Sequence, residues 1–188
     1  MKNNLEILIY DPNFSSKGHY VRFSKYFLKL SINQDKINKI IYFGKKLFSN
    51  KKILYKKIKY IDNNKGYYLT FFKKILYFKS VAKLYLKNIL FINKFGKNRK
   101  LLLLSESHFI FQFIFILFYK YDYSVVVVTI KSAYSHNIIS LIKKYIFFIF
   151  LKKASTIISL NKINQKKLNI FLNKKTFFIP ERSIWKTK

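Results

Sequence analysis

The chain opens with a short apolar run that is followed by turn residues and then by a helical pattern. Leu5 to Tyr10 is almost entirely apolar, which is typical of a strand buried on both faces of a parallel sheet. Asp11-Pro12-Asn13 and the Ser15 to Gly18 segment supply turn-forming residues. Apolar residues then recur at helical spacing from Tyr20 to Leu30. Strand, turn and helix in this order predict the start of a βαβ unit.

The same alternation continues along the chain. Further strands are expected at 37–43, 57–61, 101–104, 124–129, 156–160 and 176–179, and further helices at 70–92, 108–120, 138–151 and 162–172. Connecting segments of this length between strands are typical of parallel sheets. The pattern therefore predicts an α/β fold over residues 1–180, a Rossmann-like, doubly wound, mostly parallel sheet with helices on both faces.

Composition narrows the class of partner. The net charge is +31, from 38 Lys and Arg against 7 Asp and Glu, which would favour nucleic acid or an anionic membrane. Arginine binds phosphate and guanine through its planar guanidinium group, but it occurs only at Arg22, Arg99 and Arg182. The composition therefore does not favour nucleic acid as a partner. The absence of cysteine excludes disulfides and cysteine-ligated metal sites.

No targeting or membrane-spanning segment is expected. Glu6 and Asp11 interrupt what would be the apolar core of a signal peptide. The longest apolar stretch, 109–119, contains Gln112 and is shorter than the ~20 residues that a spanning helix needs. We therefore expect a cytoplasmic protein. Lysines at 79, 83 and 87, on one stripe of the long helix, add the expectation of a peripheral location on the inner face of the membrane.

Candidate chemistry lies just after the strands, because ligands of open α/β sheets bind at the carboxyl ends of the strands. After the first strand, Gly18 would let the backbone approach a ligand, and His19 would begin a helix, where anions are favoured. A plain strand-to-helix turn explains the same residues equally well. The three glycines of a dinucleotide fingerprint and the P-loop motif are both missing, so no nucleotide cofactor is expected.

Two further segments carry polar candidates. Residues 105–108 contain Glu106 and a histidine, suited to acid–base work, although Ser107 as a helix cap explains most of the cluster. Lys131 and His136 follow the valine-rich strand, where an ordinary cap or surface role is an alternative. The three histidines fall on three different loops, and no metal site is expected from them.

Several of these residues together resemble a known family. Ile7 to Pro12 followed by Lys17 to Tyr20 resembles the opening of GT-B glycosyltransferases, notably the large retaining family four. The resemblance continues in Val125 to Thr129 with Ser135-His136-Asn137, in the Lys152 to Asn161 segment, and in Lys175 to Glu181. Lys17 stands where that family usually has the first glycine of a pair, and Lys131 where it often has a histidine.

The resemblance implies an N-terminal, acceptor-binding domain at 1–180, the start of an interdomain hinge at 181–188, and a C-terminal donor domain that is absent from the chain. The implied reaction is sugar transfer from a nucleotide-sugar donor to a lipid-linked or polysaccharide acceptor, in cell-envelope polysaccharide biosynthesis. By the same resemblance, His19 and His136 would be catalytic residues, and Lys17, Gly18, Glu106 and Lys131 would bind substrate. No cofactor beyond the nucleotide-sugar substrate is implied, and the chain alone is expected to be inactive.

An alternative of another class remains. The same lysine-rich chain would also suit a non-enzymatic binding module recruited to an anionic membrane or to nucleic acid.

Overall fold

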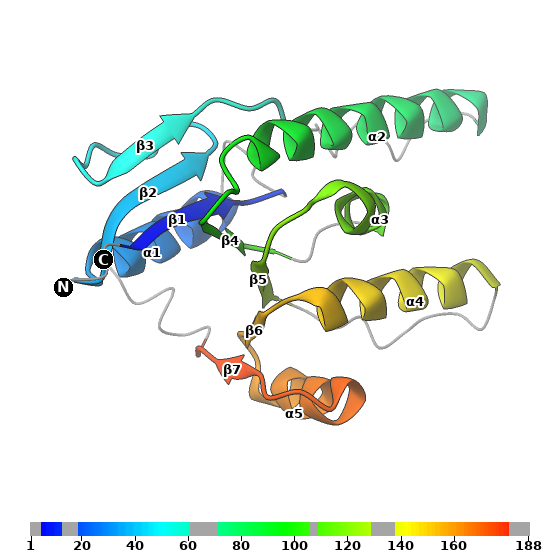
Figure 1. Ribbon diagram of the computed structural model, residues 1–188. Coiled ribbons are helices and arrows are strands. Elements are labelled where there is room, and N and C mark those ends of the chain that lie inside the picture. Colours follow the sequence, from blue (N-terminus) through cyan, green and yellow to red (C-terminus); the bar gives the residue numbers. More distant parts are fainter. Residues whose placement is uncertain (1–4, 13–18, 61–70, 106–108, 129–137, 181–188) are drawn as a thin grey trace.

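The computed structural model describes residues 5–12, 19–60, 71–105, 109–128 and 138–180 (Figure 1). Within these residues, seven strands form one sheet in which every neighbouring pair is parallel. The strands are β1 (Leu5–Tyr10), β2 (Ile37–Phe43), β3 (Ile53–Lys56), β4 (Lys100–Leu103), β5 (Tyr123–Val127), β6 (Thr156–Ser159) and β7 (Phe177–Phe178). The helices are α1 (His19–Ile32), α2 (Phe71–Asn93), α3 (Phe109–Phe118), α4 (Ile138–Lys153) and α5 (Lys162–Leu172). The predicted Rossmann-like α/β fold is confirmed.

The strand order is β3-β2-β1-β4-β5-β6-β7. The chain therefore builds outward from β1 in one direction, through β2 and β3, and then returns to the other side of β1 to begin β4. This reversal makes the gap between β1 and β4 the topological switch point of the sheet, the place where open α/β folds bind their ligands.

Side chains of β1 alternate between two cores, as the two-residue period of a strand requires. Leu8 and Tyr10 belong to the larger core, which α2, α3, α4 and α5 cover, whereas Ile7 and Ile9 pack in a smaller core with Phe23 of α1. Figure 1 shows this unequal covering, with α1 behind β1 and β2 and the other four helices together on the opposite side. Among the described residues, both faces of the sheet are thus covered.

The third strand lies four residues earlier than the sequence pattern indicated. The prediction of a strand at 57–61 is wrong, because Ile53–Lys56 pairs with β2 in the register Ile40↔Ile53. Residues 53–56 form a short apolar run that ends in a lysine, whereas residues 57–61 alternate lysine with apolar side chains. Both patterns are compatible with a strand, so local pattern does not choose between them. Tertiary contacts do: Ile53 is buried in the smaller core, and the Tyr60 hydroxyl instead donates a hydrogen bond to the carbonyl of Phe43, at 2.9 Å.

The other elements overlap their predicted ranges and differ only at their ends, by a few residues. The long helix α2 departs from prediction in a different way. Of the apolar positions that keep helical spacing, Tyr85 and Ile89 are buried, but Ile75 and Phe78 are exposed. The amino-terminal half of this helix extends beyond the strands (Figure 1), and its described side chains from Lys73 to Ser80 are exposed except for Tyr77, which is partly buried against the larger core.

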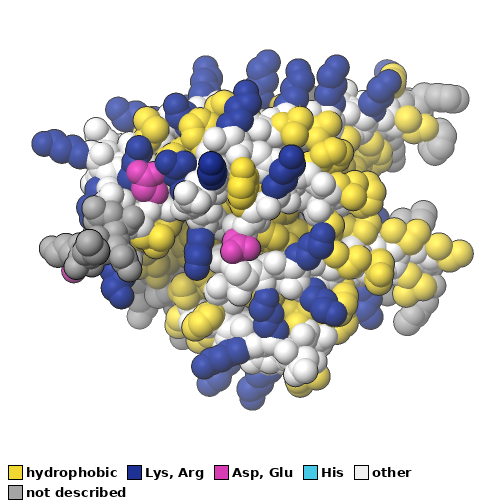
Figure 2. Space-filling model, in the orientation of Figure 1, with side chains coloured by type: hydrophobic (Ala, Val, Ile, Leu, Met, Phe, Trp, Pro, Cys, Tyr) yellow, Lys and Arg dark blue, Asp and Glu magenta, His cyan; other side chains and the backbone are white. Residues whose placement is uncertain are grey.

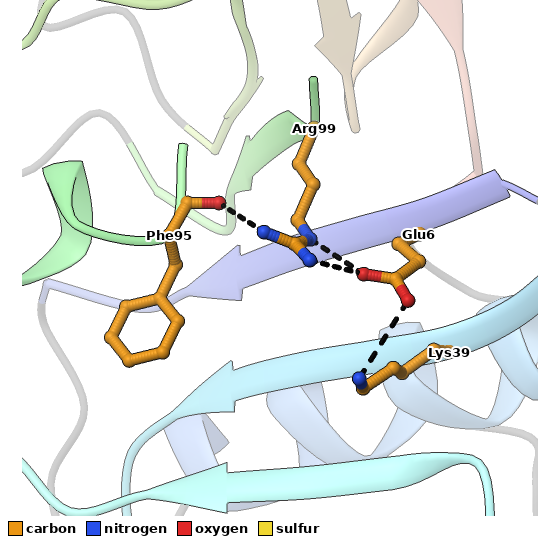
Figure 3. Close-up of polar contacts among 4 residues, drawn as sticks. All are labelled: Glu6, Lys39, Phe95 and Arg99. Atoms are coloured by element: carbon orange, nitrogen blue, oxygen red, sulfur yellow. Dashed lines mark hydrogen bonds and ion pairs between the residues drawn. The ribbon is translucent and has the colours of Figure 1, made fainter. Parts of the chain in front are cut away.

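An ion cluster joins the amino ends of three segments (Figure 3). Glu6 of β1 accepts from Arg99 Nε and lies 2.6 Å from Arg99 Nη2, both through Oε2, while its Oε1 lies 3.6 Å from Lys39 Nζ of β2. Arg99 also donates to the carbonyl of Phe95, at 3.0 Å, beyond the end of α2. The hydrogen bond from Arg99 is the main reason that the pKa of Glu6 lies below its usual 4.5.

Acid should weaken the fold through Glu6. Because its folded pKa is lowered, the stability it contributes is fully present above pH 4.5 and is lost as the pH falls through the lower folded value. We expect Glu6→Gln to reduce the free energy of unfolding by about 1 kcal/mol near neutrality, and by much less near pH ~3. Urea unfolding at both pH values measures this. Asp35→Asn, at an exposed carboxylate after α1, is the control. It should leave the difference in the free energy of unfolding between the two pH values as large as in the unmodified protein.

Candidate functional site

The candidate site lies at the carboxyl ends of β1 and β4, at the switch point of the sheet. The two strands are paired directly, with Tyr10 opposite Leu103, and the amide of Leu104 donates to the carbonyl of Tyr10 at 2.9 Å. Asp11 directly follows β1, and Ser105 lies two residues after β4, so each strand is followed by a polar side chain at this edge.

Asp11, the first residue after β1, is fully buried. Its Oδ2 accepts a hydrogen bond from Ser24 Oγ of α1 at 3.1 Å, and its Oδ1 accepts one from Ser105 Oγ, just after β4, at 3.3 Å. Burying a carboxylate is costly unless donors surround it. The Asp11 side chain therefore joins β1, α1 and the end of β4.

Three tyrosine hydroxyls lie near this carboxylate. Burial raises the pKa of Tyr10, Tyr42 and Tyr60, and the negative charge of Asp11 adds a smaller increase to each. All three phenols are consequently neutral at physiological pH. Asn88 of α2 donates to the Tyr10 hydroxyl at 3.4 Å and to the carbonyl of Lys59 at 2.9 Å, which ties the larger core to this edge.

Gly44, directly after β2, is required by the packing of these tyrosines. A Cβ atom at this position would lie 2.4 Å from Cε1 of Tyr42 and 2.7 Å from the hydroxyl oxygen of Tyr60. Neither ring has room to retreat easily, since Tyr42 is fully buried and Tyr60 is hydrogen-bonded to Phe43. The glycine thus lets the carboxyl ends of β2 and β3 close against one another.

The structure tests the predicted site residues only in part. His19 is the first residue of α1. The other predicted site residues, Lys17, Gly18, Glu106, Lys131 and His136, lie outside the described residues.

The strands that precede these residues can nevertheless be placed. Segments 13–18, 106–108 and 129–137 follow β1, β4 and β5, which are neighbours in the sheet and parallel. Their last described residues, Pro12, Ser105 and Val128, therefore lie along the same edge of the sheet. The three segments chosen from the sequence all begin at this edge.

Sequence reasoning did not select the residues that form the buried cluster. Asp11 and Ser105 lay inside candidate segments without being named as site residues, and Ser24, Tyr42 and Gly44 were not considered. One signal was present in the sequence: Asp11 directly follows the four apolar residues that end the first strand, Ile7 to Tyr10. Ser24, a polar residue beside the buried Phe23, was a second signal, but its partner is 13 residues away and only the fold identifies it.

Within the described ranges, no group of three His, Cys, Asp or Glu side chains is placed to hold a metal ion. In the same part of the chain, every helix is too short or too polar to cross a bilayer.

Comparison with known proteins adds no family assignment. Neither a protein-family model nor a curated protein sequence matches the chain.

Proposed function

We propose that residues 1–180 form the acceptor-binding domain of a GT-B glycosyltransferase, which transfers a sugar from a nucleotide-sugar donor to a lipid-linked or polysaccharide acceptor. A Rossmann-like sheet serves many functions, so the fold alone does not carry this proposal. The supporting observation is the buried Asp11, which joins β1, α1 and the end of β4 at the switch point. Ile7 to Pro12, the first of the segments that resemble the family, ends at that point.

The proposed roles of individual residues come from the segments that resemble the GT-B family. His19 and His136 are the proposed catalytic residues, because a histidine can exchange a proton with the acceptor hydroxyl near neutral pH. Gly18 lets the backbone approach the acceptor, and Lys17 and Lys131 pair with its phosphate groups, with Glu106 accepting from sugar hydroxyls. The donor nucleotide binds to a second domain, and the enzyme works at the cytoplasmic face of the membrane.

Binding measurements on residues 1–188 test this division of labour. We expect equilibrium dialysis to detect short-chain, water-soluble prenyl-phosphate glycans bound to the protein, and to detect no binding of nucleotide sugars. No sugar transfer is expected from this chain alone, and adding a donor domain should restore it. Gly18→Val should abolish glycan binding, since we propose that the acceptor contacts the backbone at Gly18 and a branched side chain there would occupy the same space.

A matched control is available on α5. Ile170 is 83% exposed, so Ile170→Val should leave both glycan binding and stability unchanged. Binding of a nucleotide sugar without any glycan would contradict the proposal, and so would a Gly18→Val protein that keeps its glycan affinity with an unchanged melting temperature.

The binding-module alternative is favoured by a different observation, the net charge of +31. It predicts salt-sensitive binding to polyanions of any kind, with no preference for a glycan. Glycan binding that survives a rise from about 0.1 M to about 1 M salt therefore separates the two functions.

A further inference from the structure

The amino-terminal halves of α2 and α4 expose apolar side chains that nothing in the described chain covers. None of the described side chains from Lys73 to Ser80 of α2 is buried, and the first buried one is Val81. The side chains that are more than half exposed on these two helices are Ile75, Leu76, Ile138, Leu141, Ile142 and Tyr145. We call these six residues the α2–α4 tip.

The tip residues come from two helices but lie toward one side of the molecule. α2 and α4 begin after parallel strands end, so both start at the carboxyl edge of the sheet and run back along it. Figure 1 shows their amino-terminal halves extending the same way, to the right of the strands, and α3 packs against both helices. On that side of the surface, Figure 2 shows hydrophobic side chains gathered between lysines.

Such exposure needs an explanation. Single apolar residues on a surface are normal, but groups of them on one side of a protein mark an interaction site. Leu76 and Ile138 are 64% and 75% exposed, on helices whose other halves are well packed. The tip therefore points to a partner with an apolar interior.

Charge identifies the kind of partner. α2, α3 and α4 contain no acidic residue, and the exposed lysines closest in sequence to the tip residues, among those described, are Lys73 and Lys79 on α2 and Lys144 on α4, whose Nζ also lies 6.0 Å from the ring centroid of Phe171 on α5. A second copy of this chain would bring these lysines together with no carboxylate to offset them. Nucleic acid would satisfy the lysines but leave the aliphatic side chains in water. An anionic bilayer satisfies both, because its phosphates lie directly above its hydrocarbon.

We propose that the α2–α4 tip docks this protein on an anionic bilayer, with its apolar side chains at the boundary between headgroups and acyl chains. Lys73, Lys79 and Lys144 then bind lipid phosphates around the inserted side chains. The docked protein turns the carboxyl edge of the sheet, and with it the switch point, toward the membrane. The docking deepens the proposed function by bringing the site to a lipid-linked acceptor, but it rests on the tip and not on transferase activity.

Single-cysteine labelling tests the insertion directly. The chain has no cysteine, so a cysteine placed at Leu76, Ile142 or Ile170 takes up one environment-sensitive nitrobenzoxadiazole label. Vesicles of phosphatidylcholine with phosphatidylglycerol should shift the emission of labels at 76 and 142 to the blue. The label at 170, on α5 and outside the tip, should stay in an aqueous environment. Vesicles without glycan lipid are used, so failure here would leave the proposed function standing.

Co-sedimentation with the same vesicles measures the contribution of the tip. We expect Leu76→Gln with Ile142→Gln to weaken binding about 100-fold, about tenfold for each side chain withdrawn from the apolar phase. The matched control, Ile163→Gln with Ile170→Gln on α5, should weaken it less than about threefold, although these residues are similarly exposed, at 64% and 83%.

Three outcomes would overturn the proposal. The first is equal binding of the tip variant and the α5 control. The second is equal binding to neutral and anionic vesicles. The third is a blue shift at 76 and 142 that appears without vesicles as the protein concentration rises, which would make the tip an interface between copies of the chain.

Discussion

Replacing Phe111 with alanine is expected to lower the free energy of unfolding by about 3–5 kcal/mol. This ring is fully buried at the centre of the larger core. It meets Tyr10 of β1, Tyr85 of α2 and Phe150 of α4 edge-on, with ring centroids 6.0, 5.1 and 6.5 Å away. One side chain of α3 thus joins the sheet to two neighbouring helices, and these rings cannot collapse into the space that it would leave.

Phe113 provides the matched control on the same helix. It lies two residues away, and its side chain is 49% exposed. Phe113→Ala should therefore cost less than about 1 kcal/mol. Urea unfolding followed by circular dichroism measures both variants. Similar losses for the two would mean that α3 does not pack in the way described.

Asp11→Ala is expected to cost about 2–4 kcal/mol, the second large effect. The substitution removes the acceptor of Ser24 and of Ser105 at a fully buried position, so both hydroxyls are left without their carboxylate. Asp11→Asn keeps the shape of the side chain and one acceptor oxygen, and should cost about half as much.

A double-mutant cycle isolates the link across the switch point. Asp11→Ala and Ser105→Ala should be coupled by about 1 kcal/mol or more, because each removes the same hydrogen bond. Asp11→Ala and Ser80→Ala should be additive, since the Ser80 hydroxyl bonds to the carbonyl of Leu76 within α2. Additivity in the first pair would show that the Asp11–Ser105 contact contributes nothing to stability.

The sequence predicted most accurately the elements whose ends are determined by adjacent residues. Helix α5 was predicted with both of its ends correct. Its amino end is capped by Asn161, whose side chain accepts from the amides of Ile163 and Asn164, and its carboxyl end by Asn173 at φ 46°, a left-handed conformation that asparagine tolerates. Both caps are made by residues adjacent to the helix, so neighbouring residues are enough to predict them.

The third strand shows the opposite case. Residues 53–56 are a short apolar run and residues 57–61 alternate lysine with apolar side chains, so either segment could form a strand, and the choice between them depends on pairing with β2 and on the burial of Ile53. The amino-terminal half of α2 is similar. Its helical spacing is regular, but spacing cannot reveal that the sheet ends before the helix does, which leaves Ile75 and Leu76 more than half exposed.

By itself, the sequence determined the alternation of strands and helices, and hence the parallel Rossmann-like sheet, since hydrophobic period and turn residues act over a few neighbours. It also indicated the edge of the sheet where ligands would bind, because that edge follows from the direction of the strands. Only the tertiary structure decided which polar side chains meet there. Asp11 and Ser105 are 94 residues apart in the sequence. Ser105 can donate a hydrogen bond to Asp11 only because the topology of the sheet places β4 beside β1. Contacts at such separation depend on the whole topology, which no local pattern records.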